Sequence, residues 1–344
     1  MSSLKRTLQL RADVPGDLSR AADLLRSGRL VAFPTETVYG LGANALDASA
    51  VAKIFIAKQR PSWDPLIVHI SNAFMLGQVA DLSGPVLEKY QRLAGAFWPG
   101  PLTLLLPRAG TIADAVTAGR PRVGTRMPAH PVALALIEEA GIPVAAPSAN
   151  RFGHTSPTTP AHVLDDLDGR IDAVLDGGAS SIGVESTVLD VCEDPMLLYR
   201  PGAISLEQII VVAGPTEIFH TSSSAGTRSP QSLPSPGLNL RHYAPIAKLL
   251  LVEDRTELFA ASYELAPSGR VGVMLPDGWD PGPASLIFPW GSWNAPQILA
   301  RRLFSGLREL DVQAAATILC PLPQQADGLP AALRDRLLKA ARRL

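Results

Sequence analysis

The sequence predicts a layered α/β protein built from two domains. Short apolar runs typical of buried strands alternate along the chain with amphipathic stretches typical of helices. The length of 344 residues corresponds to about two domains at roughly 100–200 residues each. A stretch rich in Ser, Thr, Pro and Gly interrupts the alternation. We therefore expect a first domain over 1–213, a linker over 214–245 and a smaller second domain over 246–344.

Capping residues and apolar runs set the expected elements of the first domain. A helix over 19–27 ends at Gly28, and Ser49 is the expected N-cap of a helix over 49–58. Further runs predict strands over 30–33, 66–70, 102–106, 143–146, 173–176 and 186–191, and a helix over 132–140 that ends at Gly141.

The second domain continues the alternation in a βαβ-like pattern. The runs predict strands over 248–252, 271–275 and 316–320, and helices over 256–265, 296–310 and 330–344. We expect a small α/β domain with a parallel sheet.

Composition excludes several classes of function. The chain has 31 Lys and Arg against 32 Asp and Glu, a formal net charge of -1, which argues against a polycation that holds nucleic acid by charge alone. The start of the chain lacks the pattern of a signal peptide, and no apolar run reaches the length of a membrane span. Cys192 and Cys320 lie far apart and form no metal or disulfide motif. These features predict a cytoplasmic protein without a structural zinc site.

The sequence has neither a dinucleotide-binding motif in its required context nor a P-loop. The residues from Gly40 to Ala45 match the G-x-G-x-x-A pattern of dinucleotide-binding folds. In such folds the first glycine directly follows the first strand, whereas here six residues from Pro34 to Tyr39 intervene. No lysine follows a glycine, so a P-loop is excluded. We do not expect a dinucleotide or P-loop site.

Polar residues gather where predicted strands and helices end. Two hydroxyls and a carboxylate, Thr35, Thr37 and Glu36, follow a strand and precede an expected glycine turn, which suits either a ligand site or a local turn. Lys58 and Arg60 lie at a helix end, where cations favour the helix dipole or clamp an anion.

Further hydroxyl, amide and guanidinium groups follow the same pattern. Ser148 and Asn150 follow a strand of small residues and suit a phosphate, a nucleobase or a helix cap. Arg126 precedes a helix and Arg200 ends a strand. Each of these motifs is weak evidence alone. The sequence has no nucleophile–His–Asp order typical of a catalytic triad. Several cations and hydroxyls at strand ends instead favour a site for a polyanion and a carboxylate-bearing substrate.

Taken together, these segments resemble a known family. Its blocks are matched in order by Phe33 to Asn44, Lys58 with Arg60, Pro65 to His69, Trp98 to Thr103, Arg126 to Pro128, Ala146 to Asn150, Gly183 to Thr187 and Arg200 to Gly202. The chain resembles the YrdC/Sua family, the threonylcarbamoyl-AMP synthases, densely over 18–206. The stretches 235–245 and 328–336 are similar to the linker and C-terminal domain of its longer, two-domain branch.

The resemblance implies a fold and a reaction. The fold is a YrdC/RibB-like twisted sheet flanked by helices, with a smaller Rossmann-like α/β domain behind it. The reaction converts L-threonine, bicarbonate and ATP into threonylcarbamoyl-adenylate and pyrophosphate. ATP is then a substrate that carries Mg²⁺, and a threonylcarbamoyl-transferase complex receives the product for an adenosine beside the tRNA anticodon. No covalent nucleophile is required, and no metal ligands are expected from the chain.

The resemblance also assigns residues by matching position. The expected L-threonine ligands are Thr37, His69, Arg126, Ala146 and Ser186. The expected ATP and bicarbonate ligands are Lys58, Arg60, Asp64, Arg122, Ser148, Asn150, Ser156, Arg200 and Tyr243, with Lys58 and Arg60 as the catalytic cations. Because Tyr243 lies in the linker, it reaches ATP only if the linker folds back over the site as a lid.

Two positions depart from the family pattern. Asp64 stands where asparagine is common, and Arg122 stands where a small hydroxyl residue is common. Asp64 must bind the metal or face away from the phosphates, and Arg122 either adds a phosphate contact or points to solvent.

Two other functions compete with the synthase reaction. They are double-stranded RNA binding without catalysis, or at least a weak RNA contact, and carbamoyl-phosphate chemistry. The net charge of -1 argues against RNA binding as the main function. The presence of only two cysteines argues against carbamoyl-phosphate chemistry.

Overall fold

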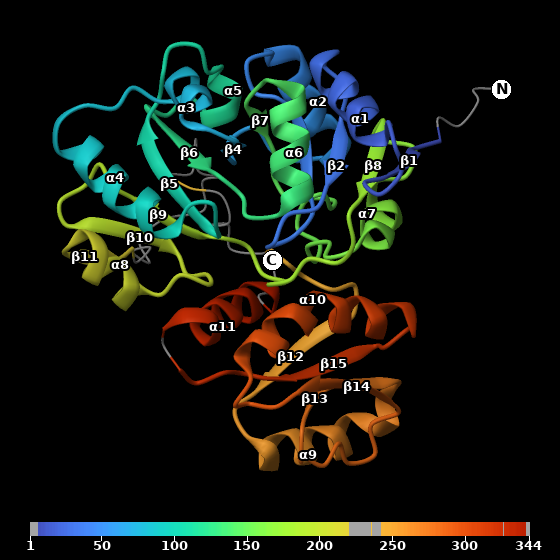
Figure 1. Ribbon diagram of the computed structural model, residues 1–344. Coiled ribbons are helices and arrows are strands. Elements are labelled where there is room, and N and C mark those ends of the chain that lie inside the picture. Colours follow the sequence, from blue (N-terminus) through green and yellow to red (C-terminus); the bar gives the residue numbers. More distant parts are fainter. Residues whose placement is uncertain (1–5, 220–234, 236–241, 326, 342–344) are drawn as a thin grey trace.

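The computed structural model describes residues 6–219, 235, 242–325 and 327–341. Two sheets organise these residues, a large one in the first domain and a small one in the second (Figure 1). Most of the expected linker, 220–234 and 236–241, lies outside the described residues. The mixed α/β architecture with two domains is confirmed, and the domain boundaries stay a prediction. The first sheet continues past 213, because its last strand is Thr216–Ile218.

The large sheet joins the strand ends that carry the candidate site. In the described residues its order is β1-β8-β2-β3-β7-β4-β6-β5-β9-β10-β11. The strands are β1 (Leu8–Arg11), β2 (Val31–Phe33), β3 (Gly40–Asn44), β4 (Ile67–His69), β5 (Leu102–Pro107), β6 (Arg122–Arg126), β7 (Val144–Ala145), β8 (Ala173–Asp176), β9 (Thr187–Asp190), β10 (Met196–Arg200) and β11 (Thr216–Ile218).

Helices flank this sheet, and several of them begin at a side-chain N-cap. They are α1 (Asp17–Arg26), α2 (Ala48–Lys58), α3 (Ala73–Val79), α4 (Gly84–Phe97), α5 (Asp114–Thr117), α6 (Pro131–Ala140), α7 (Pro160–Leu167) and α8 (Leu206–Ala213). The N-cap of α2 is Asp47 and not Ser49 as expected, because the Asp47 carboxylate accepts the backbone N–H groups of Ser49 and Ala50. Helix α6 ends as predicted at Gly141, whose φ of 66° suits a glycine.

The glycine-rich segment at 40–44 is a strand and not the turn that the sequence predicts. It is β3, which pairs antiparallel with β2 and with β7. A Cβ atom at Gly42 would lie 2.8 Å from the Phe33 ring and 2.9 Å from a Val144 methyl group. Glycine is therefore present for close packing and not for a turn.

The second domain is the parallel α/β domain that the resemblance implies. Its four described strands have the order β12-β15-β13-β14, and every pair is parallel. The elements are β12 (Lys248–Val252), α9 (Arg255–Leu265), a 3-10 turn η1 (Ala266–Ser268), β13 (Val271–Pro276), β14 (Leu286–Gly291), α10 (Pro296–Val312), β15 (Thr317–Pro321) and α11 (Gly328–Ala341). Strand β14 is not among the strands that the sequence predicts.

The two domains pack directly against each other. Figure 1 shows α10 and α11 on the side that faces the first domain and α9 on the far side. Val38 and Val184 of the first domain belong to the same buried cluster as Phe304 of α10. A Cβ atom at Gly183 would lie 2.6 Å from the Ala300 carbonyl oxygen, so the loop before β9 touches the backbone of α10.

We predict that Gly42→Ala destabilises the protein while Gly95→Ala does not. The new methyl group at 42 overpacks β2 and β7, at a cost of about 1–3 kcal/mol. Gly95 lies within α4, and no atom of the described residues beyond its own helix backbone lies within 4 Å of the added carbon. Alanine there stabilises by roughly 0.5–1 kcal/mol. Urea unfolding of both variants measures this difference. Equal stability of the two variants would contradict the packing role of Gly42.

Candidate active site

A single pocket gathers most of the residues that the sequence singles out. It lies where β4, β6, β7, β9 and β10 meet the loop between β2 and β3. It is lined by Thr35, Thr37, Val38, Gly40, Arg60, Pro65, Ile67, His69, Arg126, Ala146, Pro147, Ser148, Glu185, Ser186, Arg200, His242 and Tyr243. All five expected threonine ligands are in this set, and so are Arg60, Ser148, Arg200 and Tyr243 of the expected nucleotide set.

Arg126 is the central cation of one half of the pocket. Its guanidinium donates from Nη1 to Thr37 Oγ1 at 2.9 Å and from Nε to the Gly100 carbonyl at 3.1 Å. Its Nη2 lies 2.6 Å from Glu36 Oε1, in a buried ion pair. Burial opposes ionisation of Glu36, but the charge of Arg126 and the hydrogen bonds to the carboxylate together outweigh burial and lower the pKa of this carboxyl. The guanidinium is thus fixed in place at the pocket wall.

His69 lies beside Arg126 as a neutral imidazole. Burial, and then the charge of Arg126, lower the pKa of His69 to about 3. Its Nδ1 has no hydrogen-bond partner in the part of the chain that the structure describes. The ring contacts Phe33 edge-on at a centroid distance of 6.2 Å. A neutral ring with an unpaired nitrogen at the pocket wall is suited to a hydrogen bond with a polar ligand.

Arg60 forms another wall of the pocket, and it is the ion-pair partner of Asp64. Arg60 donates from Nε to the Asp64 carbonyl at 3.1 Å and from Nη2 to the Pro65 carbonyl at 2.7 Å. The same Nη2 lies 3.0 Å from Asp64 Oδ2. Asp64 is fully buried and does not line the pocket, so it lies behind Arg60. Burial raises the pKa of Asp64, against the charge of Arg60.

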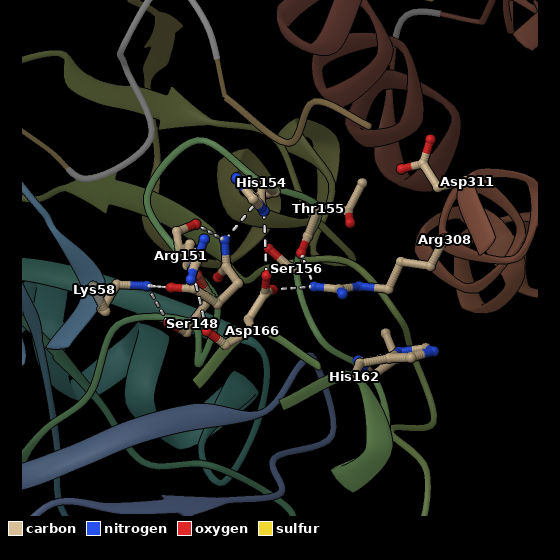
Figure 2. Close-up of polar contacts among 12 residues, drawn as sticks. Lys58, Ser148, Arg151, His154, Thr155, Ser156, His162, Asp166, Arg308 and Asp311 are labelled. Carbon is tan, nitrogen blue, oxygen red and sulfur yellow. Dashed lines mark hydrogen bonds and ion pairs between the residues drawn. The ribbon is translucent and has the colours of Figure 1, made fainter. Parts of the chain in front are cut away.

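Lys58 lies behind the pocket lining and holds the loop after β7. Its Nζ donates to the carbonyl oxygens of Ser148 and Asn150, as Figure 2 shows for Ser148. The side chain is 1% exposed, and burial followed by the charge of Arg60 lowers its pKa. Direct contact of Lys58 with a phosphate, as the sequence suggests, is therefore not available in this conformation. Lys58 instead fixes the backbone that presents Ser148.

Asn150 and Ser156 also lie behind the lining. Asn150 Nδ2 donates to the carbonyls of Arg151 at 2.8 Å and His154 at 2.9 Å. Ser156 Oγ donates to Glu185 Oε1. The two side chains therefore shape the loop and the pocket wall and leave the pocket surface to their neighbours.

The end of the linker reaches the pocket as expected. Tyr243 is buried and has a positive φ of 65°. Its ring packs on Phe304 of α10, with centroids 5.8 Å apart, and lies 5.3 Å from the guanidinium carbon of Arg336. Arg200 donates to the Ser186 carbonyl at 3.0 Å and to Ser186 Oγ at 3.1 Å. Among the described residues, no carboxylate lies within ion-pair distance of Arg200.

Arg122 is the one expected ligand that the structure places in a different depression. Its guanidinium pairs with Asp190 and lies 2.6 Å from Glu193 Oε1. Arg122 and Arg126 begin and end β6, about 13 Å apart at roughly 3.3 Å per residue. Two carboxylates at the far end of the strand hold Arg122 there, so the expected phosphate contact is not found.

The sequence did not assign a role to three charged residues of the site. Glu36 pairs with Arg126, and Glu185 lines the pocket. Arg336, in α11 of the second domain, is fully buried and lies 2.7 Å from Glu185 Oε2. The resembling segment 328–336 contains Arg336, but no spacing rule connects it with a glutamate 151 positions earlier.

The buried charges around this pocket are predominantly positive. The pocket lining has three arginines, Arg60, Arg126 and Arg200, against one carboxylate, Glu185. A buried charge without a counter-charge is costly, so such a site favours ligands that bring negative charge. The arrangement suits a carboxylate near Arg126 together with a phosphate-bearing ligand near Arg60 and Arg200.

Comparisons with known proteins agree with this geometry. A model of the Sua5, YciO and YrdC proteins, described as "Telomere recombination", matches residues 23–202. A second model, described as "Threonylcarbamoyl-AMP synthase, C-terminal domain", matches residues 204–342. A threonylcarbamoyl-AMP synthase of Bacillus subtilis (strain 168) is 44% identical over 330 residues, which cover 94% of this chain and 92% of that protein.

An archaeal relative and a solved structure extend the likeness over both domains. A threonylcarbamoyl-AMP synthase of Pyrococcus abyssi (strain GE5 / Orsay) is 43% identical over 93% of each chain. The crystal structure of P. abyssi Sua5 complexed with L-threonine superposes with a TM-score of 0.87 at 40% identity and covers 97% of both chains.

The fold and the pocket define a two-domain α/β protein whose first domain carries a cation-lined ligand site. The matches to both family models and to full-length relatives identify it further. The chain belongs to the Sua5 family of threonylcarbamoyl-AMP synthases. The resemblance inferred from the sequence is therefore confirmed, whereas the roles of single residues stay predictions.

We predict that buried histidines weaken the protein at acidic pH. Burial, and then the charge of Arg308, lower the pKa of His162 to about 4, and burial lowers the pKa of His69 and His242 as well. Below pH about 6.5 the unfolded chain binds protons that these rings in the folded protein do not. The free energy of unfolding therefore falls as the pH drops from 7 to 5.

His162 offers the clearest test because it lies outside the pocket. Urea unfolding of the wild type and of His162→Gln is measured at pH 7.5 and at pH 5. The variant is expected to lose less stability between the two values, since one titrating ring is gone. An equal loss in both proteins would show that His162 is not held neutral by the fold.

Proposed function

We propose that this chain synthesises L-threonylcarbamoyladenylate from L-threonine, bicarbonate and ATP, with release of pyrophosphate. The observation that carries the proposal is one pocket lined by three arginines, Arg60, Arg126 and Arg200. We assign Arg126 to one half of this pocket and Arg60 with Arg200 to the other. A substrate carboxylate and a nucleotide phosphate can be held there side by side. The family membership and the names of the relatives support the same activity, and they do not support the RNA-binding alternative.

In this proposal the first half of the pocket binds L-threonine. Arg126, fixed by Thr37 and Glu36, binds the substrate carboxylate through its guanidinium. His69, Ser186 and the backbone of Ala146 supply neutral hydrogen-bonding groups around the rest of the amino acid. A solved structure of the P. abyssi relative is complexed with L-threonine, which supports threonine as a ligand of this chain.

The second half of the pocket binds ATP and bicarbonate. Arg60 and Arg200 face the phosphates, and Ser148 and Tyr243 line the same wall. Lys58, Asn150 and Ser156 act from behind by fixing the loop after β7. Arg60 remains the proposed catalytic cation, whereas Lys58, which the sequence also predicts in that role, is proposed as a positioning residue that fixes the backbone presenting Ser148.

The chemistry requires positioning and charge stabilisation more than a protein nucleophile. The threonine amine attacks bicarbonate and gives a carbamate, with loss of water. A carbamate oxygen then attacks the α-phosphorus of ATP, and pyrophosphate leaves with the electron pair of the broken P–O bond. Preorganised guanidinium groups stabilise the charge that develops on the phosphate oxygens.

The carboxylates beside the pocket are already engaged by arginines. Glu36 pairs with Arg126, Asp64 with Arg60 and Glu185 with Arg336. In the described residues, no group of three or more His, Cys, Asp or Glu side chains is suited to a metal ion. We therefore propose that Mg²⁺ enters as its complex with ATP and keeps phosphate and water oxygens as its main ligands. When bound, it would neutralise part of the charge of the phosphates.

The destination of the product follows from the family resemblance. We propose that a threonylcarbamoyl-transferase complex takes up the adenylate and modifies tRNA, and that this occurs in the cytoplasm. No helix of the described residues is long and apolar enough to cross a membrane. A weak RNA contact during transfer stays a prediction.

The test is pyrophosphate release from ATP and Mg²⁺, with L-threonine and bicarbonate each omitted in turn. We expect release only when both are present. In the same assay, Arg126→Met is expected to raise the KM for threonine about 10–100-fold, because a charge-assisted hydrogen bond contributes about 1.5–3 kcal/mol. Its KM for ATP should change little.

Arg108→Met serves as the matched control, since Arg108 pairs with Asp114 at the partly exposed surface and does not line the pocket. It should leave both KM values unchanged. Release without threonine, or from folded protein under no condition, would refute the proposed reaction. A wild-type KM for threonine in Arg126→Met would remove Arg126 from the site.

A further inference from the structure

Two arginines of the second domain reach across the domain boundary, one to a loop of the first domain and the other to a glutamate that holds the next residue of the same loop. The loop lies between β7 and α7 and contains Thr155 and Ser156. Arg308 comes from α10, and Arg336 comes from α11. Because the same loop carries Ser148 and Asn150 of the proposed nucleotide site, its shape bears directly on that site.

Arg308 holds the loop at Thr155. Its Nη2 donates to the Thr155 carbonyl at 2.6 Å and to Asp166 Oδ2 at 2.6 Å (Figure 2). The other oxygen of Asp166 lies 3.2 Å from Nδ1 of His154, the residue before Thr155. Burial opposes ionisation of Asp166, but hydrogen bonds and charges from His154 and Arg308 lower its pKa. Arg308 therefore fixes the loop both directly and through a charged carboxylate.

Arg336 holds the next residue of the loop through Glu185. Its Nε lies 2.7 Å from Glu185 Oε2, and its Nη1 donates to the Pro201 carbonyl at 3.1 Å. The second oxygen of Glu185 accepts the hydroxyl of Ser156. Because Arg336 is 0% exposed and Glu185 lines the pocket, the contact is part of the pocket wall and not a surface ion pair.

The two arginines differ in what they hold, because Arg336 also donates to the backbone carbonyl of Glu185, the residue before Ser186. The hydrogen bonds of Arg308 go to Thr155 and Asp166, neither of which we assign to threonine. Of the residues assigned to threonine, Thr37, His69 and Arg126 lie outside this loop, whereas Ala146 begins it and Ser186 follows Glu185. The loop carries three residues of the nucleotide site, Ser148, Asn150 and Ser156, and the last of these lies at the position that the second domain holds through Glu185.

We propose that Arg308 and Arg336 form an interdomain clamp on Thr155 and Ser156 that positions the ATP-binding half of the active site. The proposal rests on the proposed function for the identity of the ligand. It gives the second domain a defined role, because charges on that domain set the geometry of a loop in the first. Arg308 and Arg336 are positioning residues, since neither is placed in contact with a substrate.

The test compares Arg308→Met with Arg308→Lys and with a control on the same helix. Arg302→Met is the control, because Arg302 lies over the Phe288 ring within the second domain, at 5.0 Å, on a contact that does not involve the loop. Three quantities are measured on the full chain: the KM for ATP, the dissociation constant of L-threonine, and amide hydrogen exchange in peptides covering 150–156.

We expect Arg308→Met to raise the KM for ATP about tenfold and to speed exchange over 150–156, with threonine affinity within about twofold of the wild type. A tenfold change corresponds to about 1.4 kcal/mol, the scale of one charge-assisted hydrogen bond. Arg308→Lys should recover part of both effects, and Arg302→Met should show neither. Arg336→Met is expected to act in the same direction.

Unchanged exchange in Arg308→Met would overturn the clamp whatever the activity. Faster exchange with an unchanged KM for ATP would overturn its role in positioning the nucleotide half. A lower kcat with both substrate affinities unchanged would also overturn it, because that pattern indicates a general loss of folded protein. The proposed function fails separately, if the wild-type chain releases no pyrophosphate.

Discussion

The structure depends on the burial of positive charge around one pocket. Arg60, Arg126 and Arg200 line it, and Lys58 lies just behind. Burial lowers the pKa of Lys58 and of Arg200, because their charged forms lose solvation in the interior. Ion pairs with Glu36 and Asp64 compensate two of the guanidinium groups. The rest of the compensation is left to the substrates, which bring a carboxylate, a bicarbonate and a triphosphate.

Both domains contribute to this charged pocket. The large sheet delivers cations and hydroxyls from strand ends that are distant in sequence, and β3 needs Gly42 because it packs tightly between β2 and β7. The second domain closes the arrangement from outside. Helices α10 and α11 contribute Phe304 against Tyr243 and Arg336 against Glu185. The active site is therefore a product of both domains, although its lining residues outside 242–243 all come from the first.

The sequence predicted the fold class, most strands and about half of the residues that line the pocket, because these rest on local patterns and on ordered family blocks. It failed where a position is decided by distant neighbours. Gly40 and Gly42 look like a turn until Phe33 and Val144 are placed beside them. Arg122 carries the right charge, but Asp190 and Glu193 hold it at the far end of β6. The pairing of Glu185 with Arg336 spans 151 positions, which no spacing rule covers.

The most direct test of the account is the stability of Arg200→Gln with and without ATP. If substrate binding is driven by uncompensated buried charge, neutralising Arg200 leaves the unfolding free energy of the empty protein unchanged or higher. The same change weakens ATP binding about tenfold or more, so the shift in Tm that ATP produces shrinks. A variant that is much less stable when empty, but that ATP stabilises as much as the wild type, would contradict the account.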